Sequence, residues 1–196
     1  MKGKMKSIVL ASSSARRRAL LRQIGLKFIV DPSRVEEKLN PRLKPRGQVE
    51  AISLQKAQAV AKKYKDAIVI AADTLVVFED EILGKPADEK DARRILRKLS
   101  GKTQSVVTGF TVIDCESKKC ITKSAEVKVY FKKLSDKEIK QYILLEKPLD
   151  KAGSYGVLER GAIFVEKVEG DFFAAVGLPL SKLAEELRRF GVMVLE

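Results

Sequence analysis

The run of residues 67–72 (AIVIAA) limits the fold more than any other part of the sequence. Its six consecutive apolar residues have the length of a β-strand, and an uninterrupted apolar run is typical of a strand that is covered on both faces. Segments with strand-like and with helical patterns alternate along the rest of the chain. Hairpin-like pairs occur among them, so we expect an α/β fold with a mixed sheet rather than a purely parallel one.

Apolar spacing, helix caps and turn residues divide the chain into predicted elements. The predicted helices cover residues 14–24, 48–64, 88–99, 135–147 and 181–190. The predicted strands cover residues 7–11, 27–30, 67–72, 105–114 and 121–131, with hairpins over 75–83 and 162–176 and a short strand at the C-terminus. Residues 31–47 hold three of the six prolines and are expected to form a loop. We find no repeat or linker, so residues 1–196 are treated as a single domain.

Size and composition indicate a globular protein of the cytoplasm. Hydrophobic residues make up 45% of the 196 residues, which is typical of a folded chain. No apolar run approaches the roughly 20 residues that span a bilayer, and the apolar stretch 8–11 is shorter than the core of a signal peptide. Charged residues make up 33%, and Trp and His are absent, a composition that resembles proteins of thermophiles.

The net charge of +13 implies a polyanionic partner, and both nucleic acid and nucleoside triphosphate qualify. Because the chain has no histidine, catalysis by His and His-ligated zinc are excluded. Carboxylate oxygens remain as metal ligands, and they suit Mg²⁺ or Mn²⁺. Cys115 and Cys120 flank a polar turn. Two reduced thiols on a surface loop are the favoured interpretation, and a disulfide across the turn is the alternative.

Small hydroxyl residues and arginines follow the first predicted strand. Ser12 to Ser14 lead into a predicted helix, whose unpaired N–H groups attract anions. Arg16, Arg17 and Arg18 fall in its first turn, where the positive helix end disfavours them unless an anion such as a polyphosphate compensates. The alternative is a capping serine followed by a solvated basic face, and the turn alone supports both interpretations equally.

Asp73 and Thr74 follow the apolar run. A carboxylate at the end of a buried strand lies where open α/β sheets place their active sites, and it is costly to bury without a cation or hydrogen bonds. The alternative is a turn aspartate that nearby amides satisfy. Because Thr74 leads into another predicted strand rather than into a turn, we favour the functional interpretation.

Further charged residues gain meaning only in combination. Lys85 lies in a Gly-Lys-Pro loop and Lys56 on a predicted helix, and each alone would be a solvent lysine. Asp150 and Lys151 open the segment DKAGSYG, and Glu37 lies in a basic, proline-rich loop. Acids that hold a metal and activate water, opposite cations that bind phosphates, are what cleavage of a phosphoanhydride requires. The residues therefore predict metal-dependent chemistry on a phosphorylated substrate.

Several separated motifs resemble the Maf (septum formation inhibitor) family of nucleotide pyrophosphatases. They are LASSSARRRALL, VEE, AADTLVVFEDEILGKP, LRKLSGKTQSVVTGF, DKAGSYG and VGLPL, in the family's order and over nearly the whole chain. The resemblance implies a mixed, curved sheet with flanking helices and two lobes around a deep cleft, as in the related ITPase-like fold, often as a homodimer. It also implies hydrolysis between the α and β phosphates of pyrimidine or modified nucleoside triphosphates with Mg²⁺, Mn²⁺ or Co²⁺, in a house-cleaning or division-linked role.

The resemblance also assigns expected roles to single residues. Asp73 matches the proton acceptor, and Glu37 and Lys85 match further catalytic positions. The matching substrate-binding positions are Ser12, Arg16, Arg17, Lys56, Thr74, Lys151 and Leu158, and the matching metal ligands are Glu37, Asp73 and Asp150.

Positions linked to base preference are mixed. Arg16 and Thr74 resemble the branch of the family that hydrolyses dTTP and UTP, but Leu158 stands where that branch carries glutamine. Leucine lacks the amide that would bond to a base edge, so the preferred base is left open. Ala15 replaces the usual proline before the arginines, and we expect little effect because alanine is also favourable in a first helical turn.

Two other functions are compatible with parts of the sequence. A nucleic-acid-binding module fits the charge, but no nucleic-acid motif accompanies the eight Phe and four Tyr residues. A regulator of cell division that binds a nucleotide without hydrolysing it would have no need of a proton acceptor. We therefore expect an enzyme acting on a nucleoside triphosphate, with neither nucleic acid nor membrane as its partner.

Overall fold

The computed structural model describes residues 6–195. Within this range the chain forms two compact units. Unit 1 consists of residues 6–73, 108–125 and 177–195, and unit 2 consists of residues 74–107 and 126–176. Each unit is therefore built from segments that are far apart in the sequence.

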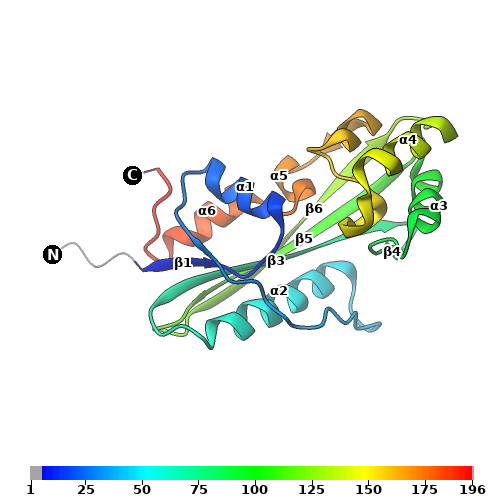
Figure 1. Ribbon diagram of the computed structural model, residues 1–196. Coiled ribbons are helices and arrows are strands. Elements are labelled where there is room, and N and C mark those ends of the chain that lie inside the picture. The colour runs from blue at the N-terminus through cyan, green and yellow to red at the C-terminus, as the bar shows by residue number, and fades with distance from the viewer. Residues whose placement is uncertain (1–5, 196) are drawn as a thin grey trace. The chain divides into compact units, whose positions relative to one another are not determined.

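The described residues form one mixed sheet of seven strands, in the order β2-β1-β3-β5-β6-β7 with β4 paired to β3 (Figure 1). The strands are β1 (Ser7–Leu10), β2 (Ile29–Val30), β3 (Ala67–Phe78), β4 (Glu81–Leu83), β5 (Thr103–Asp114), β6 (Cys120–Phe131) and β7 (Val165–Glu169). The strand β1 pairs in parallel with both β2 and β3, whereas β3 with β4 and β6 with β7 pair antiparallel. The mixed α/β architecture predicted from the sequence is confirmed.

The five predicted helices are present with small shifts of their ends, and α5 (Phe172–Val176) is an additional helix where a strand was predicted. The others are α1 (Ala15–Gln23), α2 (Pro45–Ala61), α3 (Glu89–Leu99), α4 (Asp136–Glu146) and α6 (Leu180–Arg188), with 3₁₀ turns η1 (Pro148–Asp150), η2 (Ala152–Ser154) and η3 (Arg160–Phe164). The helix α2 begins three residues earlier than predicted because Pro45 occupies its first turn, where the missing N–H has no cost. None of the helices in the described range has the length and apolar character that crossing a bilayer requires.

In unit 1, helices cover both faces of the strands. The helix α2 lies on one face, and α1 and α6 lie on the other (Figure 1). Residues 67, 69 and 71 of β3 share a fully buried cluster with Ala57 and Val60 of α2. Because side chains alternate between the faces of a strand, the row that continues through residue 73 also faces α2. This explains why the run 67–72 is apolar without alternation.

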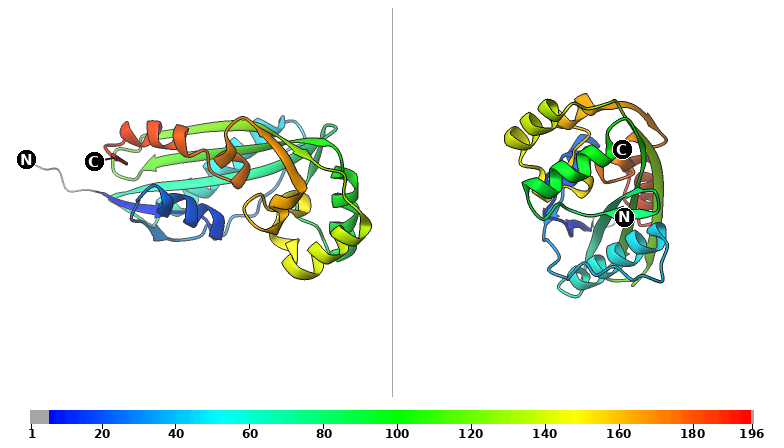
Figure 2. Two further views of the ribbon diagram at one scale, coloured as in Figure 1. Left: turned by 90° about the horizontal axis from the view of Figure 1, so that it is seen from above. Right: turned by 90° about the vertical axis from the view of Figure 1, so that its right-hand side faces the viewer.

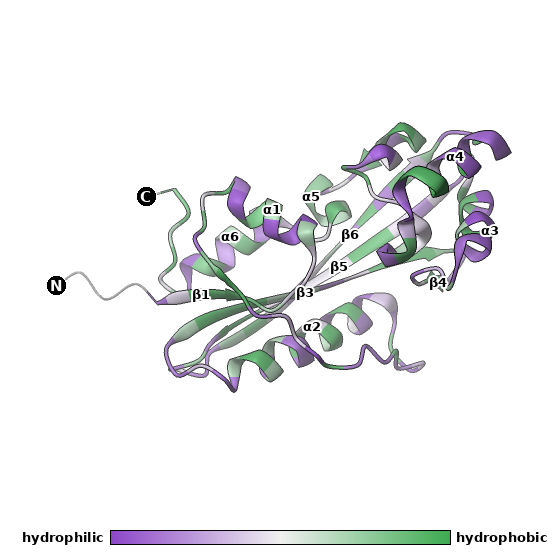
Figure 3. Ribbon diagram, in the orientation of Figure 1, coloured by the Kyte–Doolittle hydropathy of each residue, from purple (hydrophilic) through white to green (hydrophobic). Residues whose placement is uncertain are grey.

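Unit 2 packs α3 and α4 side by side (Figure 2). The helix α3 buries a stripe of apolar residues at 92, 95, 96 and 99 and is otherwise hydrophilic (Figure 3). Ser135 and Glu138 form the predicted capping box at the start of α4, in which each side chain bonds the other residue's backbone N–H. Phe131, Tyr155 and Phe164 form an edge-to-face aromatic cluster, and Tyr142 of α4 packs against Phe164.

Two predicted strands are wrong, namely the second strand of the hairpin predicted over 162–176 and the short strand at the C-terminus. Residues 162–176 do not form a hairpin, because Oδ1 of Asp171 accepts hydrogen bonds from the N–H groups of Phe173 and Ala174 and thereby caps the helical turn α5. The Gly170-Asp171 pair is therefore a helix start rather than a hairpin tip. No strand follows α6 up to residue 195, since the chain turns through Gly191 (φ +74°) and the Val192 N–H bonds back to the Leu187 carbonyl.

The two cysteines are free thiols on either side of the β5–β6 turn. Cys120 is exposed as expected, but Cys115 is buried and its N–H donates to the carbonyl of Ala67. The expectation that both lie on a surface loop is therefore wrong for Cys115.

The approach of α2 to the sheet yields a stability prediction. A Cβ atom on Gly109 of β5 would lie 2.6 Å from the backbone carbonyl of Val49 in α2. Gly109→Ala must therefore push α2 away from the strand, and we expect it to destabilise the protein by about 1–3 kcal/mol. Urea-induced unfolding measures the change.

Gly47→Ala is the matched control, because a Cβ there would lie 3.6 Å from Leu43, an ordinary contact. Alanine in a helix is more stable than glycine by roughly 0.5–1 kcal/mol, so this substitution should leave stability unchanged or raise it. Equal unfolding midpoints for Gly109→Ala and the wild type would contradict the close approach.

Candidate active site

Asp73 lies inside β3 and not at its end. The strand continues from Thr74 to Phe78 because its last residues pair with β4, which corrects the predicted placement at a strand end. Asp73 is 5% exposed, and its place in the row of residues 67, 69 and 71 directs it toward α2. A buried carboxylate at this position requires a cation or hydrogen bonds from that helix.

Lys56 of α2 supplies the cation. Its Nζ lies 2.7 Å from Oδ1 of Asp73 and 2.7 Å from Oε1 of Glu37. Lys56 is 7% exposed, so the ammonium is withdrawn from water and depends on the two carboxylates for its stabilisation. The helical spacing of the buried residues in α2 places Lys56 on the same face as Ile52 and Val60. The helical spacing in the sequence therefore already indicated that Lys56 faces the core rather than solvent.

The loop that carries Glu37 is held to the start of α2. The buried side chain of Gln48 accepts a hydrogen bond from the Asn40 N–H and donates to the Asn40 carbonyl. The side chain of Glu37 is 44% exposed. One carboxylate of the pair is thus accessible to solvent while the other, Asp73, is enclosed.

Ser12 and Arg17 form a second polar group at the start of α1. Ser14 caps the helix, as predicted. The Oγ of Ser12 accepts hydrogen bonds from the Ser14 N–H and from Nη1 of Arg17, both at 3.3 Å. The Nε of Arg17 donates to the carbonyl of Gly177 at 2.9 Å. The first-turn N–H groups, a serine hydroxyl and a guanidinium therefore lie together.

The charges of Asp73 and Glu37 act on Arg17 and so link the polar group at the start of α1 with the two acids. Burial lowers the pKa of Arg17 below its ordinary value, the charge of Asp73 opposes that shift, Arg16 lowers the pKa further and Glu37 raises it. A guanidinium still remains charged at neutral pH. Ser12, Arg16, Arg17, Glu37, Lys56 and Asp73 are thus brought together within unit 1.

The remaining predicted residues belong to unit 2. The buried Lys151 donates from Nζ to Oδ1 of Asp150 at 2.9 Å. The Gly153 N–H donates to the Gly84 carbonyl at 3.1 Å, so the segment DKAGSYG and the loop that carries the exposed Lys85 lie side by side.

Thr74 and Leu158 are also in unit 2. Thr74 is half-buried in β3, and Leu158 is 50% exposed between η2 and η3.

The carboxylates of unit 1 fit a divalent cation. Glu37 and Asp73 already share one positive group, the Lys56 ammonium, and oxygen donors suit Mg²⁺ and Mn²⁺. No group of three His, Cys, Asp or Glu side chains that would hold a metal occurs among residues 6–195. Mg²⁺ is usually bound by one or two carboxylates together with substrate phosphates, so two acids are a sufficient protein contribution.

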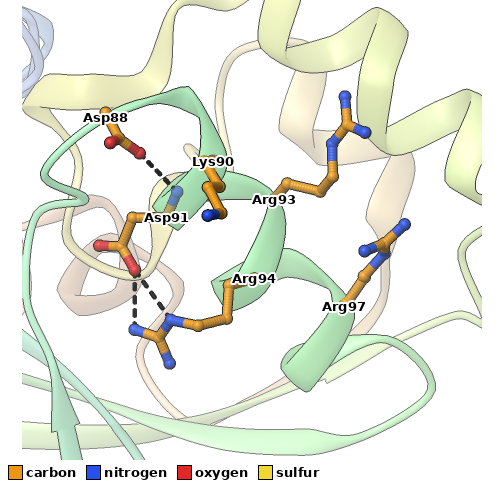
Figure 4. Close-up of a pocket in the computed structure, with 6 residues that line it drawn as sticks. All are labelled: Asp88, Lys90, Asp91, Arg93, Arg94 and Arg97. Carbon is orange, nitrogen blue, oxygen red and sulfur yellow. Dashed lines mark hydrogen bonds and ion pairs between the residues drawn. The ribbon is translucent and has the colours of Figure 1, made fainter.

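A pocket of about 440 Å³ lies along α3 in unit 2 (Figure 4). Its lining consists of charged residues of the helix and its cap, namely Asp88, Lys90, Asp91, Arg93, Arg94 and Arg97. Arg94 pairs with Asp91, and Arg97 makes two hydrogen bonds to Asp136. Asp88 caps the helix. No predicted site residue contributes to this pocket, which is lined by a surface ion-pair network.

Comparison with known proteins gives results that agree with the sequence motifs. The model of the family described as "Maf-like protein" matches residues 7–190. A dTTP/UTP pyrophosphatase of Bacillus cereus (strain ATCC 10987 / NRS 248) is 45% identical over 190 residues, which cover 97% of this chain and 93% of the relative. A dTTP/UTP pyrophosphatase of Dictyoglomus turgidum (strain DSM 6724 / Z-1310) is 45% identical over 191 residues, with coverages of 97% and 99%.

Among solved structures, that of the Staphylococcus aureus Ham1 protein matches 64% of this chain and 72% of its own, with a TM-score of 0.47 and 19% identity. A match this loose supports no argument.

The buried ion pair yields a prediction that does not depend on catalysis. Lys56→Met removes the cation and leaves Asp73 buried without it, so we expect the free energy of unfolding to fall by about 3–5 kcal/mol. Thermal unfolding measures the loss. Mg²⁺ should raise the unfolding temperature of Lys56→Met more than that of the wild type, because a metal then neutralises the same carboxylates.

Lys63→Met is the control, because Lys63 pairs with Asp31 at the surface of the same unit. Exposed pairs contribute about 0–1 kcal/mol. A loss for Lys56→Met no larger than that for Lys63→Met would refute the role of the buried pair.

Proposed function

This chain belongs to the Maf-like protein family, and from that premise we propose that it is a nucleoside triphosphate pyrophosphatase acting on dTTP and UTP. It hydrolyses the anhydride between the α and β phosphates and releases a nucleoside monophosphate and pyrophosphate. Relatives named dTTP/UTP pyrophosphatase that match 97% of the chain support this activity. The structural observation that supports this activity is the pairing of Lys56 with both Asp73 and Glu37.

Asp73 is the proton acceptor in this proposal. Its ion pair with Lys56 stabilises the charged carboxylate in a buried position, and a charged carboxylate can take a proton from an attacking water. Because the strand and α2 both hold it, its orientation is fixed before substrate arrives. Such preorganisation lowers the reorganisation needed in the transition state.

The triphosphate is bound by the start of α1 and its arginines. Ser12, Arg16, Arg17 and the first-turn N–H groups form a cradle of donors for phosphate oxygens. The excess of basic over acidic residues lies almost entirely in unit 1, and the resulting field favours the approach of a polyanion to that unit.

A divalent cation, Mg²⁺, Mn²⁺ or Co²⁺, belongs to the same proposal. Glu37 and Asp73 would hold it, and the metal would neutralise charge that develops on the phosphates. Lys85 and Lys151 are proposed contacts of the phosphate chain, and Lys85 also acts in catalysis.

Thr74 and Leu158 are proposed contacts of the nucleoside. We place the enzyme in the cytoplasm as a homodimer.

Replacing the proton acceptor should abolish turnover. Asp73→Asn keeps the shape of the side chain but cannot accept the proton, so we expect kcat for dTTP to fall by about 10²–10⁴-fold. Release of pyrophosphate measures it. Asp66→Asn, an exposed change just before the same strand, should leave kcat unchanged, and near-wild-type turnover by Asp73→Asn would refute the assignment.

Metal removal should stop the reaction reversibly. With EDTA present we expect no pyrophosphate release, and added Mg²⁺ or Mn²⁺ should restore it because phosphate charge is again neutralised. Full turnover in EDTA would contradict the metal requirement. Binding of DNA or RNA over a salt series, in a preparation that releases no pyrophosphate, would instead support the nucleic-acid-binding alternative.

Base preference should respond to residue 158. Leucine has no hydrogen-bonding group, so we expect weak discrimination among dTTP, UTP and CTP in the wild type. Leu158→Gln should raise the ratio of kcat/KM for dTTP over CTP by about tenfold, the effect of one added hydrogen bond. A panel of triphosphates tests this, and an unchanged ratio would show that residue 158 does not contact the base.

A further inference from the structure

The segment 177–180 (GLPL) has no role in the chemistry proposed so far. It leads into α6, whose N-cap is Pro179. Leu178 is fully buried, and Gly177 is buried with φ +125°. A buried anchor and a proline next to a glycine with positive φ hold this backbone in one conformation. The segment is therefore suited to present a backbone group at a fixed point.

The group that it presents is the Gly177 carbonyl. This oxygen accepts a hydrogen bond of 2.9 Å from Nε of Arg17, a residue 160 positions earlier in the chain. Nη1 of the same guanidinium donates to Oγ of Ser12 at 3.3 Å. Because a guanidinium is planar and its donors are rigidly arranged, these two bonds together fix its orientation.

We propose that the Gly177 carbonyl is a positioning group for the phosphate-binding site, acting through Arg17. It holds one edge of the guanidinium and thereby sets the direction of the donors that face the Ser12 loop. This inference rests on the proposed binding of a polyphosphate by Ser12, Arg16 and Arg17. It gives the positive-φ conformation at Gly177 a function in substrate binding rather than in folding alone.

Glycine is required at this position because of its backbone. A φ of +125° is a conformation that residues with a Cβ rarely adopt. Any other residue rotates the peptide toward negative φ and moves the attached carbonyl away from Nε of Arg17. Gly177→Ala therefore alters Arg17 without touching its side chain.

Calorimetric binding of inorganic tripolyphosphate with Mg²⁺ tests the proposal without relying on turnover. For Gly177→Ala we expect the Kd to rise about tenfold, as one charge-assisted hydrogen bond no longer orients the guanidinium. Gly191→Ala is the matched control, because Gly191 also has positive φ, at +74°, and a Cβ there meets nothing within 4 Å. Its Kd should stay within about twofold of the wild type.

A double-mutant cycle separates positioning from general strain. If Gly177 acts through Arg17, then Arg17→Ala and the double variant Arg17→Ala with Gly177→Ala should bind tripolyphosphate equally within about twofold. Independent, multiplying losses would overturn the proposal, and so would equal Kd values for Gly177→Ala and Gly191→Ala. A wild type that does not bind tripolyphosphate would overturn it as well.

Turnover of dTTP by the same proteins distinguishes a failure of the positioning role from a failure of the proposed function. Tripolyphosphate binding that follows the expected pattern in a wild type that releases no pyrophosphate would refute the proposed function and leave the positioning role intact. Pyrophosphate release by the wild type, with KM raised about tenfold and kcat nearly unchanged in Gly177→Ala, supports both.

Discussion

The buried ammonium of Lys56 is the interaction on which the site of unit 1 depends. A charge withdrawn from water is stable only beside charges of opposite sign, and Lys56 has two, from a strand and from a loop. The pairing requires α2 to lie close against the sheet. The absence of a side chain at Gly109 permits this approach, and Gln48 ties the loop of Glu37 to the same helix.

The same requirement links stability with chemistry. A desolvated carboxylate costs folding free energy unless its ion-pair partner is in place. Once paired, the carboxylate is already oriented to accept a proton. Arg17 extends the arrangement toward α1, because its half-buried guanidinium lies in the field of Asp73 and is held by Ser12 and by the Gly177 carbonyl. Acids and cations thus form one electrostatic group rather than separate sites.

Sequence patterns predicted most of the architecture because the patterns are local. The apolar run 67–72, the cap at Ser14 and the capping box at Ser135 each specify their element through neighbours in the chain, and all three are present. The hairpin over 162–176 was wrong because Asp171 caps a helical turn, and a Gly-Asp pair is compatible with both outcomes. The hairpin predicted over 75–83 is present as the pairing of β3 with β4, but the local pattern did not show that β3 runs without a break through Asp73 and Thr74 into it.

The site was predictable in part. Asp73 and Ser12 were recognisable from their position beside predicted elements. Glu37 and Lys56 gained meaning only in combination with other charged residues, and the family resemblance then assigned their roles. Lys56 contacts both acids because α2 packs against β3. This packing is tertiary structure, which the local sequence does not specify. The bond between Arg17 and the Gly177 carbonyl joins segments 160 residues apart, and neither motif by itself indicates the other.

Crystals grown with Mn²⁺ and a non-hydrolysable dTTP analogue would show, through the anomalous signal of the metal, whether the acids paired with Lys56 form the metal site. We expect a Mn²⁺ peak bound by Asp73 and Glu37, with the phosphate chain at Ser12 and Arg17. A nucleotide and metal bound elsewhere, with Lys56 still paired to both carboxylates and no ligand near them, would contradict it.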